Sequence, residues 1–87
     1  MTLFKGKRCE IDIIKDILRY ANKDIKKTRL LYKTNLSYTT FIKYTNFLKN
    51  RKFIEVKKSN PTGQKYKTTD NGRKLINDID NLMKQLR

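Results

Sequence analysis

The sequence predicts a small α+β domain that is mostly α-helical, with three helices, then a β-hairpin, then a C-terminal helix. Two patterns predict this class. Apolar residues recur at steps of three and four residues in separate segments, as on one face of a helix, and a later stretch alternates with the period of two that marks a strand. The chain has 87 residues, which suffices for one compact domain and is too short for two.

The first two predicted helices lie before residue 35. Apolar residues at helical spacing indicate a first helix over residues 9–21: Ile11, Ile13, Ile14, Ile17, Leu18 and Ala21. Turn-prone residues at 22–24 interrupt the pattern. A short second helix then ends near Thr34, and we expect either Asp24 or Thr28 to cap its start.

A brief turn over residues 34–36 precedes the third predicted helix, which runs from Tyr38 to about Asn50 with Ser37 as its N-cap. One arc of this helix is mostly apolar and is expected to face the core: Phe41, Tyr44, Thr45 and Leu48. The opposite arc is polar and basic: Thr39, Lys43, Asn46 and Asn50. At the margins of the core arc, Ile42 and Phe47 are expected to pack against the core.

The two segments after the third helix, residues 53–58 and 65–69, are rich in β-formers or alternate with period two, and they predict a β-hairpin. Residues 60–63 between them suit a type I turn, with Pro at the second position and Gly at the fourth. Thr69 or Asp70 is expected to cap the last helix. That helix carries an apolar stripe: Leu75, Ile76, Ile79, Leu82, Met83 and Leu86.

In this order the elements match the plan of a winged helix-turn-helix, whose third helix enters the major groove of DNA while the hairpin, or wing, reaches over the adjacent backbone. Asn pairs with adenine, Lys with guanine, and Thr contacts the thymine methyl group, so the outer face of the third helix can read base edges. Lysines on the wing can meet phosphates. The candidate DNA-binding residues are Lys27, Arg29, Ser37, Tyr38, Thr39, Thr40, Lys43, Asn46, Lys57, Lys58, Lys65 and Lys67.

The charge distribution favours double-stranded DNA as the partner. The net charge is +14, and residues 22–69 hold thirteen Lys and Arg against Asp24 and Glu55. The basic part of the chain therefore coincides with the predicted helix-turn-helix and wing. Plainer interpretations stay open, because lysines on an edge strand also prevent aggregation and Tyr38 would also serve to pack against the preceding turn.

The C-terminal helix predicts self-association. About two turns would close the domain's own core, whereas a helix of ~18 residues spans ~27 Å. We therefore predict a winged helix-turn-helix DNA-binding domain over residues 1–69, and a last helix over residues 70–87 that pairs with a second copy in a homodimer. The alternative is that this helix folds back on its own domain. The predicted dimerisation residues are Leu75, Ile79, Leu82, Met83 and Leu86.

Other classes of function are disfavoured by what the sequence lacks. It has no His, no Gly-rich phosphate loop and no nucleophile elbow, so we expect neither an enzyme nor a cofactor. Cys9 is the only cysteine, so we expect neither an internal disulfide nor a zinc or other metal site. No apolar run approaches the roughly 18 residues of a membrane span, and we expect a cytoplasmic, nucleoid-associated protein without membrane contact.

Four short motifs carry a family resemblance: KTRLLY at 27–32, NLSY at 35–38, Tyr44 with Leu48, and TTDNGR at 68–73. They are similar to the small basic archaeal winged-helix proteins of the ten-kilodalton class, found as chromatin proteins and thought to act as regulators. The resemblance covers about residues 8–83. It implies a winged helix whose C-terminal helix pairs with that of a second copy in an antiparallel coiled coil, with two DNA-binding units at opposite ends.

The predicted function is double-stranded DNA binding, either as a transcription regulator or as an architectural nucleoid protein. A regulator should prefer its site over bulk DNA by roughly 10³-fold or more, whereas an architectural protein relies on counterion release and binds any duplex. The alternative is a winged-helix scaffold for protein contacts. Such a scaffold would expose apolar residues on the third helix, and the polar outer arc speaks against it.

Overall fold

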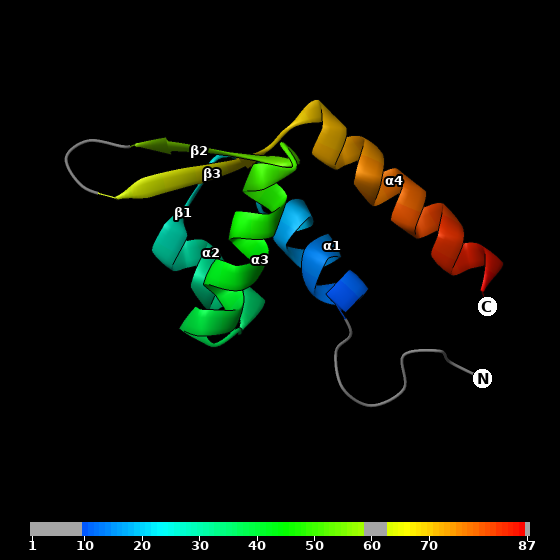
Figure 1. The fold of residues 1–87 in the computed structure, drawn as a ribbon, viewed down its shortest axis with the longest axis horizontal. Helices are drawn as coiled ribbons and strands as arrows, with labels where there is room; N and C mark the ends of the chain where they lie inside the picture. The colour runs from blue at the N-terminus through cyan, green and yellow to red at the C-terminus, as the bar shows by residue number, and fades with distance from the viewer. Residues whose placement is uncertain (1–9, 59–62, 87) are drawn as a thin grey trace.

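The computed structural model describes residues 10–58 and 63–86. Four helices and three strands follow one another along this part of the chain (Figure 1): α1 (Glu10–Tyr20), β1 (Ile25–Lys26), α2 (Lys27–Thr34), α3 (Tyr38–Asn50), β2 (Ile54–Lys58), β3 (Gln64–Thr68) and α4 (Asp70–Gln85). The predicted α+β, mostly helical architecture is confirmed. Cys9 and most of the predicted turn, residues 60–62, lie outside the described residues.

Side-chain caps begin α3 and α4, as predicted. The Ser37 hydroxyl accepts a hydrogen bond from the Thr40 amide at 3.3 Å. The Thr69 hydroxyl accepts one from the Gly72 amide at 3.1 Å and donates one to the Lys52 carbonyl at 2.7 Å. Each cap satisfies an amide that the first turn of a helix leaves without an intrahelical partner. Both helix starts are therefore fixed by residues that the sequence alone identifies.

The connection between α2 and α3 depends on a left-handed residue. Asn35 follows Thr34, where α2 ends as predicted, and adopts φ 54°. Its amide donates to the Tyr32 carbonyl at 3.2 Å. Asn tolerates this backbone conformation better than most residues with a Cβ. The chain thus reverses within three residues, which sets α2 and α3 as the two helices of a helix-turn-helix.

The predicted cap of α2 is wrong. Lys26, not Asp24 or Thr28, occupies the N-cap position, and its side chain makes no capping hydrogen bond. Lys26 instead belongs to β1, a strand that the sequence did not predict, and β1 pairs with β3. The start of α2 is therefore fixed by backbone pairing to a segment about 40 residues further along the chain.

The sheet is antiparallel with strand order β1-β3-β2, and the helices cover one of its faces (Figure 1). Tyr66 on the central strand is buried on that face, and its ring centroid lies 6.0 Å from that of Phe41 on α3. Thr68, also buried, donates its hydroxyl to the Leu18 carbonyl at 2.6 Å. The largest fully buried apolar side chains of this core are Ile17, Leu18, Leu30, Phe41, Leu48 and Ile54.

The two arcs of α3 are as predicted. Its core arc is buried: Phe41, Tyr44, Thr45 and Leu48. Its outer arc is exposed: Thr39, Lys43, Asn46 and Asn50. Ile42 packs partly against the core, as expected. The expectation for Phe47 was wrong, because this side chain is 41% exposed and packs against Arg51 of the following turn.

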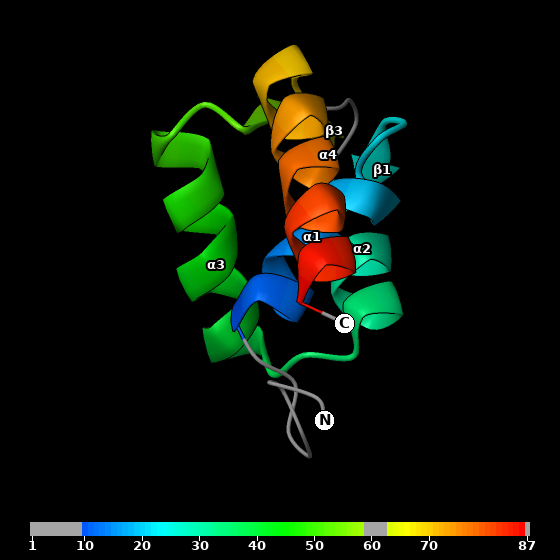
Figure 2. The same cartoon turned by 90° about the vertical axis from the view of Figure 1, so that its right-hand side faces the viewer.

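The two halves of α4 have different surroundings. In the first half, Ile79 is buried and Leu75 and Ile76 pack against the core. The ammonium of Lys15 on α1 lies 2.6 Å from the Asp80 carboxylate and lowers the pKa of that carboxyl. In the second half, Leu82 and Leu86 are 46% and 43% exposed. Figure 2 shows α4 lying along α1, so the first half of α4 closes the domain and the second half extends past it.

Candidate nucleic-acid interface

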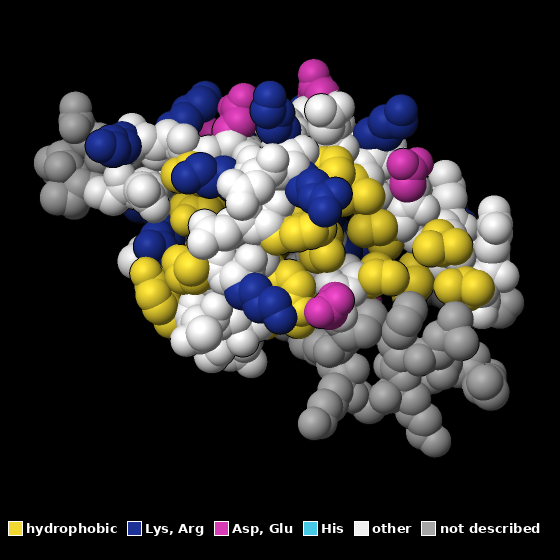
Figure 3. Space-filling model, in the orientation of Figure 1, with side chains coloured by type: hydrophobic (Ala, Val, Ile, Leu, Met, Phe, Trp, Pro, Cys, Tyr) yellow, Lys and Arg dark blue, Asp and Glu magenta, His cyan; other side chains and the backbone are white. Residues whose placement is uncertain are grey.

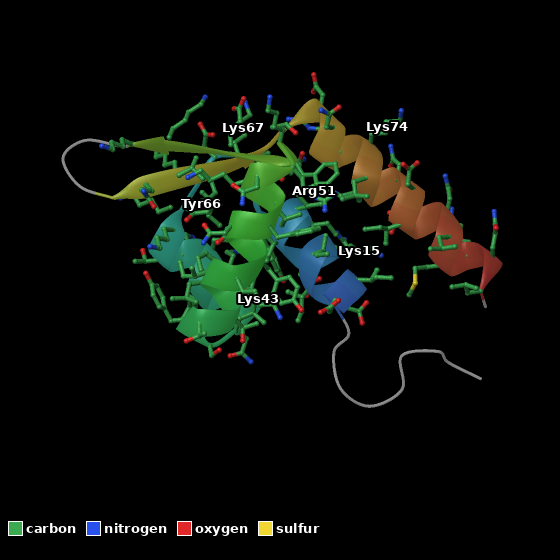
Figure 4. The ribbon with its side chains drawn as sticks, viewed as in Figure 1. Lys15, Lys43, Arg51, Tyr66, Lys67 and Lys74 are labelled. Carbon is green, nitrogen blue, oxygen red and sulfur yellow. The ribbon has the colours of Figure 1, made fainter. Side chains whose placement is uncertain are left out.

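The outward surface of α3 is a polar face that crosses the front of the molecule. The side chains of Thr39, Lys43, Asn46 and Asn50 are exposed there, because the opposite side of the helix packs into the core. Lys43 points outward from the middle of α3 (Figure 4), and its Nζ lies 5.5 Å from the ring centroid of Tyr44. One cation among neutral hydrogen-bonding groups is a composition that suits base edges in a groove.

Lys27 on α2 and Tyr38 on α3 extend this face across the helix-turn-helix. The Lys27 ammonium donates to the Tyr38 hydroxyl oxygen at 3.0 Å and lies 5.2 Å from the centre of its ring. The hydrogen bond to Tyr38 raises the pKa of Lys27. Tyr38 is 56% exposed, which places it at the surface rather than packed in the preceding turn.

Ser37 and Thr40 have a structural role in the first turn of α3. The Ser37 hydroxyl, besides accepting from the Thr40 amide, donates to Thr40 Oγ1 at 2.9 Å. Both hydroxyl groups thus take part in capping, which fixes the conformation of the first turn of α3. A ligand would reach them only by sharing these hydrogen bonds.

The end of α3 adds residues that the sequence analysis missed. The guanidinium of Arg51 lies 5.0 Å from the ring centre of the exposed Phe47. This arrangement holds a cation at the surface beside the C-terminal turn of α3 (Figure 4). The signal was present in the sequence, since an Arg four residues after an aromatic residue falls on the same side of a helix.

The register of the wing separates its four lysines. Lys57 pairs with Lys65, Glu55 with Lys67, and Lys58 with Gln64. Because side chains alternate across a strand, Lys57, Lys65 and Lys67 lie on the sheet face away from the helices. Lys67 points outward from this face in Figure 4, whereas Tyr66 points to the helices. Burial raises the pKa of the Tyr66 hydroxyl.

The predicted DNA-binding residues therefore do not form one surface. One group surrounds α3: Lys27, Ser37, Tyr38, Thr39, Thr40, Lys43 and Asn46. A second group lies on the wing: Lys57, Lys58, Lys65 and Lys67. Arg29 belongs to neither, because it lines a groove with Lys26, Lys33 and Lys65 on another side of α2. Figure 3 shows Lys and Arg side chains over the α3 side and the wing, and apolar side chains towards the C-terminal half of α4.

The described part of the chain shows neither a metal site nor a membrane-spanning helix. Over residues 10–58 and 63–86, no group of three His, Cys, Asp or Glu side chains is placed to hold a metal ion. None of the described helices is both long enough and apolar enough to cross a membrane.

Comparison with known proteins identifies the fold family. A family model described as winged helix-turn-helix matches residues 7–87. The crystal structure of Sso10a-2, described as a DNA-binding protein from Sulfolobus solfataricus, superimposes with a TM-score of 0.79 at 27% sequence identity, covering 88% of this chain and 80% of that one. No curated protein sequence matches. The family model spans almost the whole chain, and the chain therefore belongs to the winged helix-turn-helix family.

Proposed function

We propose that this protein binds double-stranded DNA, with α3 in the major groove and the wing along the adjacent backbone. The observation that carries the proposal is the outer face of α3, which is exposed, polar and basic, and continues across the helix-turn-helix through Lys27 and Tyr38. A structure of the same fold at 27% identity is described as a DNA-binding protein, which supports it. Phe47 is exposed at the edge of α3, but the outer face itself consists of polar side chains and Lys43, which favours DNA over a protein partner.

In this proposal the two groups of residues have different roles. Thr39, Lys43 and Asn46 meet base edges, because they lie on the exposed face of α3 between its first turn and just past its middle, the part of a recognition helix that lies in the groove. Lys27 and the wing lysines meet phosphates, which position the protein without reading sequence. Ser37 and Thr40 hold the first turn of α3 in place.

A selection of binding sites from random duplexes tests the proposal and separates its two versions. A sharp consensus would identify a transcription regulator, and tight binding without a consensus would identify an architectural nucleoid protein. A regulator should discriminate by roughly 10³-fold or more. Failure to retain duplex DNA at all, at 50–150 mM salt, would leave the protein-interaction scaffold as the better function.

We also propose a homodimer formed through α4, with residues 1–69 as the DNA-binding unit and 70–87 as the pairing helix. Leu75 and Ile79 already contact the chain's own core, so the pairing would depend on the second half of the helix. There Leu82 and Leu86 are exposed and Met83 is half-buried. Apolar side chains one turn apart along an otherwise polar helix are what a helical partner covers.

Replacing both Leu82 and Leu86 by Glu should convert the dimer to a folded monomer and weaken DNA binding. Two charges would enter an apolar contact, and the loss of the second DNA-binding unit removes avidity. Sedimentation equilibrium measures the mass, and circular dichroism checks the fold. The pair Asn77→Glu and Asn81→Glu, at exposed positions of the same helix, is the control. An unmodified protein that is monomeric at micromolar concentration would contradict the dimer.

Replacing Lys65 and Lys67 by Gln should reduce the salt dependence of DNA binding. Each phosphate contact removed lowers the slope of log affinity against log salt by about one unit, so we expect a fall of about one to two units with sequence preference unchanged. Both lysines are partly exposed, and such charges contribute little to folding, so the melting temperature should stay nearly constant. Titrations of a labelled duplex over several salt concentrations give the slope. An unchanged slope would mean that these lysines serve solubility.

A further inference from the structure

A second basic surface lies on the side of the molecule away from α3. Two adjoining open grooves run along α2 and β1, and both are lined by Lys26, Arg29 and Lys33. One of them also includes Lys23 and Lys65, with Asp24 as its single acidic residue. We call the surface formed by Lys23, Lys26, Arg29 and Lys33 the α2–β1 face, and the wing residue Lys65 lies at its edge.

The sheet register gathers three of the chain's lysines into one row. Lys26 on β1 pairs with Lys65 on β3, and Lys65 pairs with Lys57 on β2. Side chains directly opposite one another on neighbouring strands lie about 5 Å apart, and like charges in such positions destabilise the sheet. Among the described residues, the ion pairs Lys15–Asp80 and Arg73–Asp70 do not involve this row. A bound anion would offset the repulsion.

The α2 side of this face adds cations and hydroxyl groups. Arg29 and Lys33 lie one turn apart and so project from the same side of the helix. Tyr32 beside them is 86% exposed, and Tyr20, 43% exposed, lies under the Lys33 ammonium at 5.6 Å. Of the described residues that line the two grooves, Ile25 alone is aliphatic. The face therefore offers positive charge and hydrogen-bond donors to an anion. It has few of the apolar side chains that form the centre of a protein–protein interface.

The position of this face excludes a shared ligand with α3. In Figure 2, α3 lies at one side of the molecule, α2 and β1 lie at the other, and α1 and α4 lie between them. A straight duplex docked on the outer face of α3, with the wing along its backbone, leaves the α2 side of the α2–β1 face uncovered. An anion on the α2–β1 face must therefore come from a second molecule, or from a distant segment of the same one.

We propose that the α2–β1 face binds the phosphate backbone of a second duplex, so that a single chain holds two DNA segments together. This inference rests on the proposed DNA binding by α3, and it requires no second copy of the protein. Backbone contact without base reading is expected there, because lysines, an arginine and tyrosine hydroxyls recognise phosphates irrespective of sequence.

A bridging assay tests this inference. A biotinylated duplex is held on beads, protein is added, and capture of a second, fluorescent duplex is measured. The test variant is Lys26→Gln with Lys33→Gln. The charge-matched control is Lys74→Gln with Lys84→Gln, two exposed lysines of α4. Each protein is also assayed with Leu82→Glu and Leu86→Glu added, which removes pairing through α4. The affinity of each protein for one short duplex in solution is measured separately.

We expect the unmodified protein and the α4 control to capture the second duplex, also when pairing through α4 is removed. The test variant should capture at least about tenfold less while binding one duplex with affinity within about threefold, since each phosphate contact contributes modestly and independently. Three results would overturn the inference: no capture by the unmodified protein, capture lost only when α4 pairing is removed, or parallel loss of single-duplex binding and capture in the test variant. If any of these results is found while the protein still binds one duplex, the proposed function remains supported and only the bridging inference fails. If the protein binds no duplex at all, the proposed function and the bridging inference are both contradicted.

Discussion

Replacing Gly72 by Ala should lower the free energy of unfolding by about 3 kcal/mol, the cost of forcing an atom into a filled space. A Cβ at this position would lie 2.2 Å from the Phe53 carbonyl oxygen and 2.5 Å from Cγ2 of Thr68. The first contact is with backbone, and that carbonyl is held in place because it accepts the Thr69 amide at 3.0 Å. The strain must therefore be relieved by moving the start of α4 away from the sheet.

Urea denaturation measures this loss, with Asn71→Ala as the matched control. Asn71 is the exposed neighbour of Gly72 in the same helical turn, so its replacement changes no packing. The control should lie within about 0.5 kcal/mol of the unmodified protein. If the Gly72 variant also stayed within that range, α4 would be free to shift, and the close approach of α4 to Phe53 would contribute nothing to stability.

The parts of the fold that the sequence predicted are those set by neighbouring residues. The Ser37 and Thr69 caps act over three residues, and the two arcs of α3 follow from a spacing of three and four. Such patterns are local, so they are visible in the sequence before any tertiary contact is known. The helix-turn-helix and its polar outer face, the most informative part of the candidate site, were therefore predicted correctly from the sequence.

The parts that were missed depend on distant residues. A two-residue strand such as β1 has no periodicity of its own, and it exists because Ile25 and Lys26 meet Tyr66 and Lys65. Arg29, predicted to bind DNA with α3, instead lines the groove of the α2–β1 face with Lys26 and Lys33. Phe47 likewise has a helical phase close to the core arc, but none of the described elements buries it, and it stays 41% exposed. Tertiary context decides such positions, and local pattern does not.

Replacing Lys43 or Asn46 by Ala should weaken binding to a preferred site by about 1–3 kcal/mol, or roughly 5- to 150-fold, and relax base preference at one position each. Both side chains are exposed on the outer face of α3, near its middle, where a recognition helix lies inside the groove. Neither contributes to the buried core, so the melting temperature should change little. The loss of affinity would then report on contact with DNA and not on folding.

The chain offers matched controls on the same helix. Lys49→Ala removes the same charge as Lys43→Ala, and Asn50→Ala the same amide as Asn46→Ala, but both lie in the last turn, further from the groove-entering end. Each variant is titrated against the selected duplex and a random duplex of equal length. Contact with bases predicts a larger loss on the selected duplex for Lys43 and Asn46 than for Lys49 and Asn50. Equal losses on both duplexes would instead place Lys43 and Asn46 on phosphates, and α3 would then dock on the backbone without reading sequence.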